Sequence, residues 1–217
     1  MADKLPEHLA VLSDLDGTLI DSRASAEIAF RWWVESRGLG AELLENFPFG
    51  RKSSELIADL APQLDHEEEG ELLEKRQAEH TDGVVAVPGA AELLREHRRL
   101  VIATSGTREL ARARLAAAGL PVPERVLTAE DWEHGKPDPE PYLKAARALG
   151  ARPSECLILE DSPPGVASGV AAGIPVIAIL TSYSVAELPG AVAYLETLEP
   201  LAETVARLGI GAATRPA

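Results

Sequence analysis

Five short apolar runs constrain the fold of this chain more than any other feature of its sequence. They are rich in Val, Ile and Leu, and they lack the alternation of apolar and polar residues that marks a strand with one wet face. Strands of this kind are typical of parallel sheets that are covered on both faces. The runs comprise residues 9–13, 100–103, 126–127, 157–159 and 176–180.

Helical patterns separate the later runs. One begins at Thr107, a residue type that caps helix N-termini, and ends at Gly119, a residue type that follows helix C-termini. Two more comprise residues 138–150 and 163–173. Because strands and helices alternate, the sequence predicts an α/β fold, an open parallel sheet with helices on both faces.

The segment from residue 22 to about residue 87 interrupts this alternation. It contains helical patterns and no convincing strand, and its most charged pattern covers residues 67–80. Its apolar residues at helical spacing include Ala26, Phe30, Trp33 and Val34. We therefore expect a helical cap of residues 22–87, inserted into a core of residues 1–21 and 88–217.

The charge balance restricts the partners of the chain. With 21 basic and 35 acidic residues its net charge is −14, so we expect no nucleic acid and no anionic membrane as partner, because both require a basic surface. No stretch approaches the ~20 apolar residues of a membrane span, and no secretory signal is visible. The single cysteine, Cys156, precedes an apolar run, which is typical of a buried thiol. We expect a cytoplasmic protein, a monomer or a weak homodimer.

Polar residues gather where the expected strands end. In open parallel sheets, ligands bind beyond the carboxyl ends of the strands. Three runs and one Gly/Pro-punctuated loop contribute residues suited to phosphate or metal: Asp14, Asp16 and Gly17; Thr104, Ser105 and Gly106; Lys136; and Glu160 with Asp161. Each group alone is common in solvated loops or helix caps. Together, in this order, they indicate one site.

The carboxylates of this set predict a metal ion. Asp14 and Asp16 are two residues apart in extended chain, so their side chains project to the same side, and Gly17 allows the chain to turn sharply after them. Two carboxylates so close require a divalent cation or a shared proton. Asp161, from another strand, adds a third hard oxygen. This donor set suits Mg²⁺, which also answers the strongly negative charge of the chain.

The other members of the set suit a phosphate group. Lys136 supplies a point charge for phosphate oxygens. Thr104 and the backbone amides of Ser105 and Gly106 supply hydrogen-bond donors just ahead of an expected helix N-terminus. A small phosphate ester is therefore the expected ligand.

These motifs resemble those of the haloacid dehalogenase-like hydrolase superfamily. Residues 14–21, with the sequence DLDGTLID, are similar to its first motif, and Thr104, Lys136 and the pair Glu160 and Asp161 are similar to the second, third and fourth. The resemblance covers nearly the whole chain. It implies a Rossmann-like core with a helical cap between the first and second motifs, as the pattern of elements also suggests.

Longer strings resemble a narrower group within that superfamily, the small sugar and polyol phosphatases of bacteria and fungi. The strings are VPGA at 87–90, ATSGTR at 103–108, GKPDPEPYL at 135–143 and EDSPPG at 160–165. Members of the group act on hexose, deoxyhexose, hexitol or glycerol phosphates. Two departures are minor: Ser13 replaces a usual aromatic residue, and Pro164 replaces a usual small one.

The resemblance implies a role for each motif. Asp14 attacks phosphorus and becomes an aspartyl phosphate, and Asp16 is the acid and base. Mg²⁺ is held by Asp14, Asp161 and the backbone carbonyl of Asp16. The phosphoryl group is held and neutralised by Thr104, Ser105, Gly106 and Lys136. Glu160 is either a ligand through water or a support for other residues; the sequence leaves both open.

Other readings differ from this one in testable ways. A dehalogenase needs no acid at Asp16, because halide leaves without a proton. A hexose-phosphate mutase shares all four motifs and remains an alternative. A non-catalytic sensor of phosphorylated metabolites, an alternative of another class, would typically lack Asp14 or Asp16.

The cap is expected to set specificity, because the four motifs contact only the phosphate and the metal. Arg51 follows Gly50 in a loop between apolar helices, where its side chain could reach the core and bind substrate hydroxyls. Plain surface charge is the alternative for Arg51.

Overall fold

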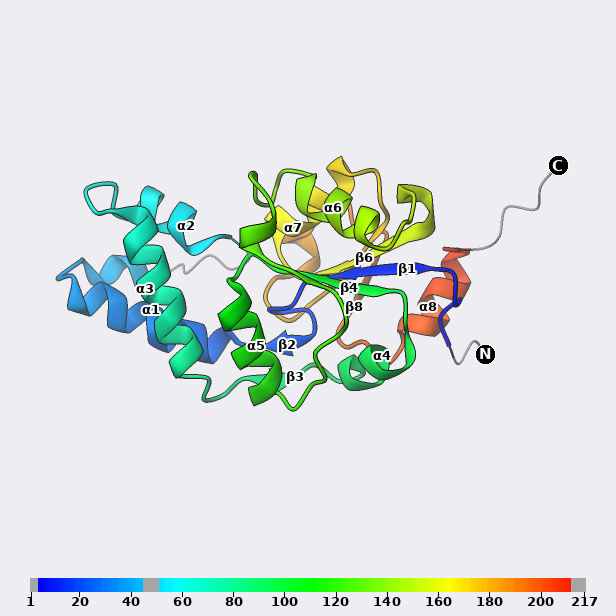
Figure 1. The fold of residues 1–217 in the computed structure, drawn as a ribbon, viewed down its shortest axis with the longest axis horizontal. Helices are drawn as coiled ribbons and strands as arrows, with labels where there is room; N and C mark the ends of the chain where they lie inside the picture. The colour runs from blue at the N-terminus through cyan, green and yellow to red at the C-terminus, as the bar shows by residue number, and fades with distance from the viewer. Residues whose placement is uncertain (1–3, 45–50, 212–217) are drawn as a thin grey trace.

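The computed structural model of the chain describes residues 4–44 and 51–211. Its core is a six-stranded sheet in the order β5-β4-β1-β6-β7-β8, and all neighbouring strands run parallel. The expected α/β fold, a Rossmann-like parallel sheet, is thus confirmed (Figure 1). The six strands are β1 (Ala10–Ser13), β4 (Leu100–Ala103), β5 (Val126–Leu127), β6 (Cys156–Glu160), β7 (Val176–Ile179) and β8 (Ala193–Leu195).

The edge strand β8 is the member of this sheet that the apolar runs did not predict. It has three residues, and two of them are only half-buried. It pairs with β7 on one side and ends the sheet. A strand this short and this exposed carries no apolar run long enough to be recognised in a sequence.

The register of the central strand places the site. β1 lies between β4 and β6, with Ser13 opposite Ile102 and Leu159. The residues that follow these three positions therefore meet at one edge of the sheet. Asp14 is the first of them, and its backbone N–H donates to the carbonyl of Leu159 at 2.9 Å.

Two hydrophobic clusters, one on each face of the sheet, hold the core helices. Successive residues of β1 supply the clusters in turn: Val11 packs into one and Leu12 into the other, and neither has exposed surface. Burying a side chain of this size contributes about 1.5–3 kcal/mol relative to leaving it exposed. The helices of the first cluster are α4 (Ala90–Glu96), α5 (Arg108–Ala117) and α8 (Leu201–Leu208); those of the second are α6 (Glu140–Ala148) and α7 (Pro163–Ala171).

Helix α5 begins and ends at the residues that the sequence predicts. Thr107 is the N-cap of α5, and its side-chain oxygen accepts a hydrogen bond from the N–H of Leu110. Gly119 follows the end of α5 with φ +66°, a left-handed conformation that favours glycine. Short 3₁₀ helices fill several of the connections: η1 (Ala41–Leu44), η2 (Ala129–Asp131), η3 (Pro153–Glu155) and η4 (Val185–Glu187).

A separate group of helices lies beyond the carboxyl ends of the strands, on the left of Figure 1. It consists of α1 (Arg23–Ser36), α2 (Ser53–Leu60) and α3 (His66–Glu79). We call these helices with their connections the cap. Their buried apolar side chains form a third hydrophobic cluster, apart from the two clusters of the core. Trp33 is fully buried in it and donates through Nε1 to Glu69 at 2.7 Å, so this tryptophan is core rather than a ligand contact.

The cap is joined to the core by a two-stranded antiparallel ribbon. β2 (Ile20–Asp21) pairs with β3 (Val85–Ala86). The expectation of no strand within residues 22–87 is therefore wrong at β3. Two residues are too few to show a strand period, so the pairing of the two chain crossings, rather than a local pattern, makes this strand. The division at residues 22 and 87 stays a prediction, and each strand of the ribbon ends one residue before one of these positions.

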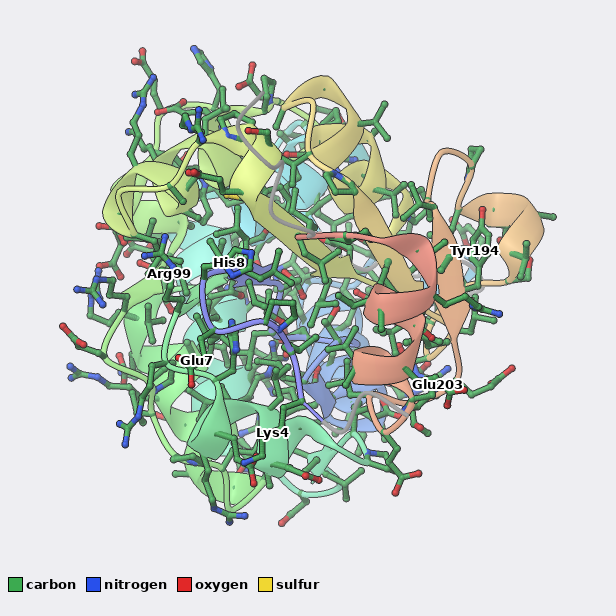
Figure 2. The ribbon with its side chains drawn as sticks, turned by 90° about the vertical axis from the view of Figure 1, so that its right-hand side faces the viewer. Lys4, Glu7, His8, Arg99, Tyr194 and Glu203 are labelled. Atoms are coloured by element: carbon green, nitrogen blue, oxygen red, sulfur yellow. The ribbon has the colours of Figure 1, made fainter. Side chains whose placement is uncertain are left out.

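The opposite end of the molecule carries the amino ends of the strands. Figure 2 views this end, where Lys4, Glu7 and His8 of the N-terminal segment and Glu203 of α8 lie. The ring Nε2 of His8 lies 2.5 Å from the carbonyl oxygen of Gly211. Cys156 is buried at the start of β6, as expected. Within residues 4–44 and 51–211, no helix has the length and apolar character to cross a bilayer.

Replacing Trp33 by alanine is expected to lower the free energy of unfolding by about 3–5 kcal/mol, because the lost side chain leaves a cavity and Glu69 loses one of its two donors, with Arg37 remaining. Trp32→Ala is the matched control: this tryptophan is half-buried and stacks under Arg76 at 4.9 Å, and its loss is expected to cost about 1 kcal/mol. Urea denaturation measures both. Equal losses would contradict the assignment of Trp33 to the interior of the cap.

Candidate active site

A buried lysine organises the site. Lys136 Nζ lies 2.5 Å from Asp14 Oδ1 and 2.6 Å from Glu160 Oε1, and the lysine side chain has no exposed surface. The ring of Tyr142 covers the ammonium group at 5.0 Å. Lys136 comes from the loop before α6, Asp14 follows β1 and Glu160 ends β6. One ion-pair cluster thus joins three elements that are far apart in sequence.

Burial and charge shift the pKa values of this cluster in opposite directions. Burial raises the pKa of Asp14 to about 7, and the charge of Lys136 opposes this rise. Burial alone would lower the pKa of Lys136, but the carboxylates of Asp14 and Glu160 raise it above its ordinary value. Lys136 is therefore a permanent cation, whereas Asp14 needs further positive charge nearby to stay ionised at neutral pH.

The role of Glu160, which the sequence left open, follows from its hydrogen bonds. Oε1 accepts from Lys136 and from the hydroxyl of Tyr142 at 2.9 Å. Oε2 accepts from the N–H of Asp161 and from both the N–H and the hydroxyl of Ser162, each at 2.9 Å. Both oxygens are thus engaged by protein donors. Glu160 thus supports Lys136 and the turn into α7, and a contact of Glu160 with a metal through water stays a prediction.

Asp161 provides the test of whether a cation fits here. Its Oδ1 accepts from the hydroxyl of Thr18 at 3.4 Å, but its buried Oδ2 has no hydrogen-bond partner. Burial and the neighbouring carboxylates of Glu160 and Asp14 raise the pKa of Asp161 well above its ordinary value. An orphaned carboxylate oxygen beside other carboxylates is the environment that a hard cation stabilises. The residues present therefore fit Mg²⁺.

The side chains of Asp14, Asp16 and Asp161 do not come together as three metal ligands. Within the parts of the chain that the structure describes, no group of three or more His, Cys, Asp or Glu side chains is placed to hold a metal ion. Asp16 accounts for this, because its Oδ1 lies 2.7 Å from Arg114 Nη1 and accepts from Ser22 Oγ at 2.7 Å. The side chains of Asp14 and Asp161, with the backbone carbonyl of Asp16, remain the set that we expect around Mg²⁺.

The turn after Asp14 leaves no room for a side chain. Gly17 has φ +84°, and a Cβ atom there would lie 1.8 Å from Asp161 Oδ2. Its carbonyl oxygen accepts a hydrogen bond from the hydroxyl of Thr181. Thr181 and Ser182 lie in the loop after β7, and sequence reasoning missed both residues. Their signal was the position directly after a predicted strand.

The expected phosphate-binding residues follow β4. Thr104 is buried, and its side-chain oxygen accepts from the N–H of Gly106 at 3.2 Å. Ser105 lies between them at the entry to α5. The backbone of this turn is held by a hydrogen bond from Thr104 N–H to the carbonyl of Leu127 at 3.1 Å.

A pocket lies between the strand ends and the cap. Most of the expected site residues line it, whereas Lys136 and Asp161 lie beneath, next to Asp14 and Gly17. From the core the lining includes Asp14, Asp16, Thr104, Ser105, Gly106 and Arg114; from the cap it includes Arg51, Ser53, Leu56, Leu73, Glu74 and Gln77.

Arg51 lies where it was expected, at the pocket, but its guanidinium group is engaged within the cap. Nη1 lies 2.7 Å from Asp59 Oδ2, and Nη2 donates to the carbonyl of Glu55 at 3.4 Å. Contact with a substrate would have to compete with Asp59, whose side chain is largely exposed.

Two residues of α3 connect the cap to the core, and sequence reasoning missed both. Glu74 Oε2 accepts from the N–H of Thr107 at 2.8 Å, and Gln77 Oε1 accepts from Arg114 Nη2 at 2.5 Å. Both α3 side chains are buried. In the sequence they belong to a strongly charged helical pattern, which is typical of a solvated face.

The core, with its buried lysine, its two aspartates after β1 and its helical cap, matches a known family. A family model described as a haloacid dehalogenase-like hydrolase matches residues 8–173. The chain belongs to the haloacid dehalogenase-like hydrolases. The expectation drawn from the four motifs is confirmed.

The relatives of this haloacid dehalogenase-like hydrolase narrow the group. Hexitol phosphatase A of Escherichia coli strain K12 is 41% identical over 178 residues, which cover 77% of this chain and 81% of the relative. Glycerol-1-phosphate phosphohydrolase 1 of Saccharomyces cerevisiae is 34% identical over 192 residues, covering 80% and 75%. A solved hydrolase from Pseudomonas syringae is 27% identical with a TM-score of 0.80, covering 92% and 99%. The resemblance to sugar and polyol phosphatases, and the expectation of a phosphatase, are confirmed.

Gly17→Ala is expected to abolish activity and to destabilise the fold beyond the cost of its backbone conformation, because its Cβ displaces Asp161. Gly119→Ala is the matched control: Gly119 also has a positive φ, but no atom lies within 4 Å of its Cβ position. The control should lose about 1 kcal/mol of stability and keep its activity. Urea denaturation and steady-state kinetics measure both. Two active variants would contradict a close approach of Asp161 at this turn.

Proposed function

We propose that this hydrolase is a Mg²⁺-dependent phosphomonoesterase that acts on a small phosphorylated sugar or polyol through an aspartyl phosphate at Asp14. The observation that carries the proposal is the Asp14 carboxylate, held by Lys136 at the base of a polar pocket beneath the cap. The substrate class is supported by the names of relatives, a hexitol phosphatase and a glycerol-1-phosphate phosphohydrolase.

Asp14 is the proposed nucleophile. Lys136 holds Oδ1, which leaves Oδ2 to form the bond to phosphorus while the bond to the leaving oxygen breaks. Because burial raises the pKa of Asp14 to about 7, cationic charge is needed to keep the nucleophile ionised. Lys136 supplies part of this charge. Mg²⁺, bound by Asp14 and Asp161, would supply the rest and offset the repulsion between carboxylate and phosphate.

Asp16 is the proposed acid and base. It gives a proton to the leaving alkoxide, and it later takes a proton from the water that attacks the aspartyl phosphate. The second step restores Asp14 and releases inorganic phosphate. An alkoxide needs this proton and a halide does not, so the presence of Asp16 favours phosphate ester hydrolysis over dehalogenation.

The turn after β4 holds the transferring phosphoryl group in this proposal. Thr104 and the amides of Ser105 and Gly106 border the same pocket as Asp14 and precede α5, whose N-terminus favours an anion. These donors bind the phosphate that every substrate carries. Discrimination between substrates is left to the cap, which closes the pocket on the side of the leaving alcohol.

Release of inorganic phosphate tests the function. We expect the protein with Mg²⁺ to release stoichiometric phosphate from at least one member of a panel of hexose, hexitol and glycerol phosphates. Excess chelator should abolish turnover, and Asp14→Asn should lower it by more than about a thousandfold while leaving the fold intact, because the amide is a poor nucleophile.

The alternatives give different results in the same assay. A hexose-phosphate mutase would convert one hexose phosphate into another without stoichiometric phosphate release. A non-catalytic sensor would bind members of the panel and turn over none of them. Full turnover in excess chelator, by protein that retains no metal, would contradict the metal assignment.

Arg51→Ala is expected to reduce kcat/KM for the preferred sugar or polyol phosphate. The reduction should correspond to a rise of ~1–3 kcal/mol in the activation free energy, which is typical of a lost polar contact. A featureless aryl phosphate, which has no hydroxyls to bind, should be hydrolysed almost as before. Lys52→Ala is the control, because this neighbouring residue lies 3.7 Å from Glu67 and does not border the pocket. A uniform loss on both substrates would assign Arg51 to phosphate binding or folding instead.

A further inference from the structure

Arg114 is a buried cation that no motif accounts for. It lies on α5 of the core, and only 5% of its surface is exposed. The neighbouring side chains Leu110, Ala111 and Leu115 are buried as the apolar face of the same helix. Burying a guanidinium group costs several kcal/mol unless it is paired. What Arg114 pairs with therefore indicates why it is there.

The two ends of the guanidinium group contact different parts of the molecule. Nη1 lies 2.7 Å from Asp16 Oδ1, on the turn after β1. Nη2 donates at 2.5 Å to Oε1 of Gln77, on α3 of the cap. The third nitrogen, Nε, is buried without a hydrogen-bond partner. The side chain is thus placed for these two contacts at the expense of its own full hydrogen bonding.

The contact with Asp16 fixes one oxygen of a carboxyl group that the reaction uses. Oδ1 accepts from Ser22 Oγ at 2.7 Å as well as from Arg114. Both contacts hold the same oxygen, and Asp16 lines the pocket. Oδ2 is consequently the oxygen left to face a leaving group above Asp14. Fixing a reacting group within a small range of orientations is worth an order of magnitude or more in rate.

The contact with Gln77 makes the hold of Arg114 on Asp16 depend on the position of the cap. Gln77 is buried and lies on the same helix as Glu74, which accepts from the N–H of Thr107 at 2.8 Å. Both contacts exist only while α3 lies against α5. When the cap is away from the core, Arg114 loses its second partner.

We propose that Arg114 is a positioning residue for Asp16 and that Gln77 ties this positioning to closure of the cap over the substrate. The inference rests on the proposed function, because it needs a leaving group that Asp16 protonates. It adds a residue of α5 and a residue of the cap to the machinery of the first step. Arg114 acts through Asp16 and not on the phosphate.

The test compares two leaving groups. For Arg114→Gln, kcat/KM for the sugar or polyol phosphate that the wild type hydrolyses best should fall by about 30- to 100-fold, since an alkoxide needs a well-placed acid. For p-nitrophenyl phosphate, whose leaving group needs little protonation, it should fall by less than about threefold. Arg114→Lys keeps the charge without the planar fork, so it should restore part of the alkyl activity. Gln77→Ala should shift the ratio in the same direction but less.

Two controls separate positioning from a merely structural role. Arg112→Gln removes an exposed arginine of the same helix and should leave both activities unchanged. In an Asp16→Asn background, Arg114→Gln should have little further effect on kcat/KM, because the group through which it acts is already lost. Thermal melting of each variant verifies that it is folded at the assay temperature.

Each result decides the matter. A wild-type protein that releases phosphate from no member of the panel would overturn the proposed function and this inference with it. If the wild type is active, the variants test only the positioning role of Arg114. Equal losses on the alkyl and aryl substrates, or a full effect of Arg114→Gln in the Asp16→Asn background, would then overturn the positioning role of Arg114.

Discussion

The organisation of the site depends on a single buried ammonium group. Lys136 lies between Asp14 and Glu160, and removing the lysine would leave two buried carboxylates without their cation, at a cost of several kcal/mol. The ends of β1 and β6 and the loop before α6 are therefore held in one arrangement. The same cluster contains a third carboxyl group, Asp161, whose pKa burial and the neighbouring carboxylates raise although Lys136 opposes the rise. The fixed position of Asp14 and the proposed need for a cation thus have one origin.

Much of this arrangement could be predicted because its signals are local. A buried strand shows itself by composition, a helix start by a residue such as Thr107, and parallel pairing brings the ends of neighbouring strands together whatever the loops do. Asp14, Thr104 and Asp161 could therefore be placed at one edge of the sheet without knowledge of any contact. The same reasoning gave the α/β architecture and the helical nature of the insert.

What could not be predicted depends on how distant elements dock. Arg114 is at helical spacing from Leu110 and Ala111, so periodicity places it on the buried face of α5, but nothing in the sequence says that this face meets α3. In the sequence, Gln77 belongs to a pattern typical of a solvated face, and only the contact between cap and core shows that it is buried. Glu160 could be assigned a role only once both of its oxygens had known donors. The short strands β3 and β8 are defined by their partners rather than by their own residues.

In the ribbon of β2 and β3, the chain leaves the core along one strand and returns along the neighbouring strand. Paired strands lie about 5 Å apart, so the ends of the inserted segment are neighbours, and the insert has a hydrophobic interior of its own. A segment with adjacent ends and an independent interior is a module that can be exchanged for one of another size without stretching the scaffold beneath it. This connection therefore allows the insert to be replaced as a unit during evolution, while the core that carries Asp14 stays unaltered.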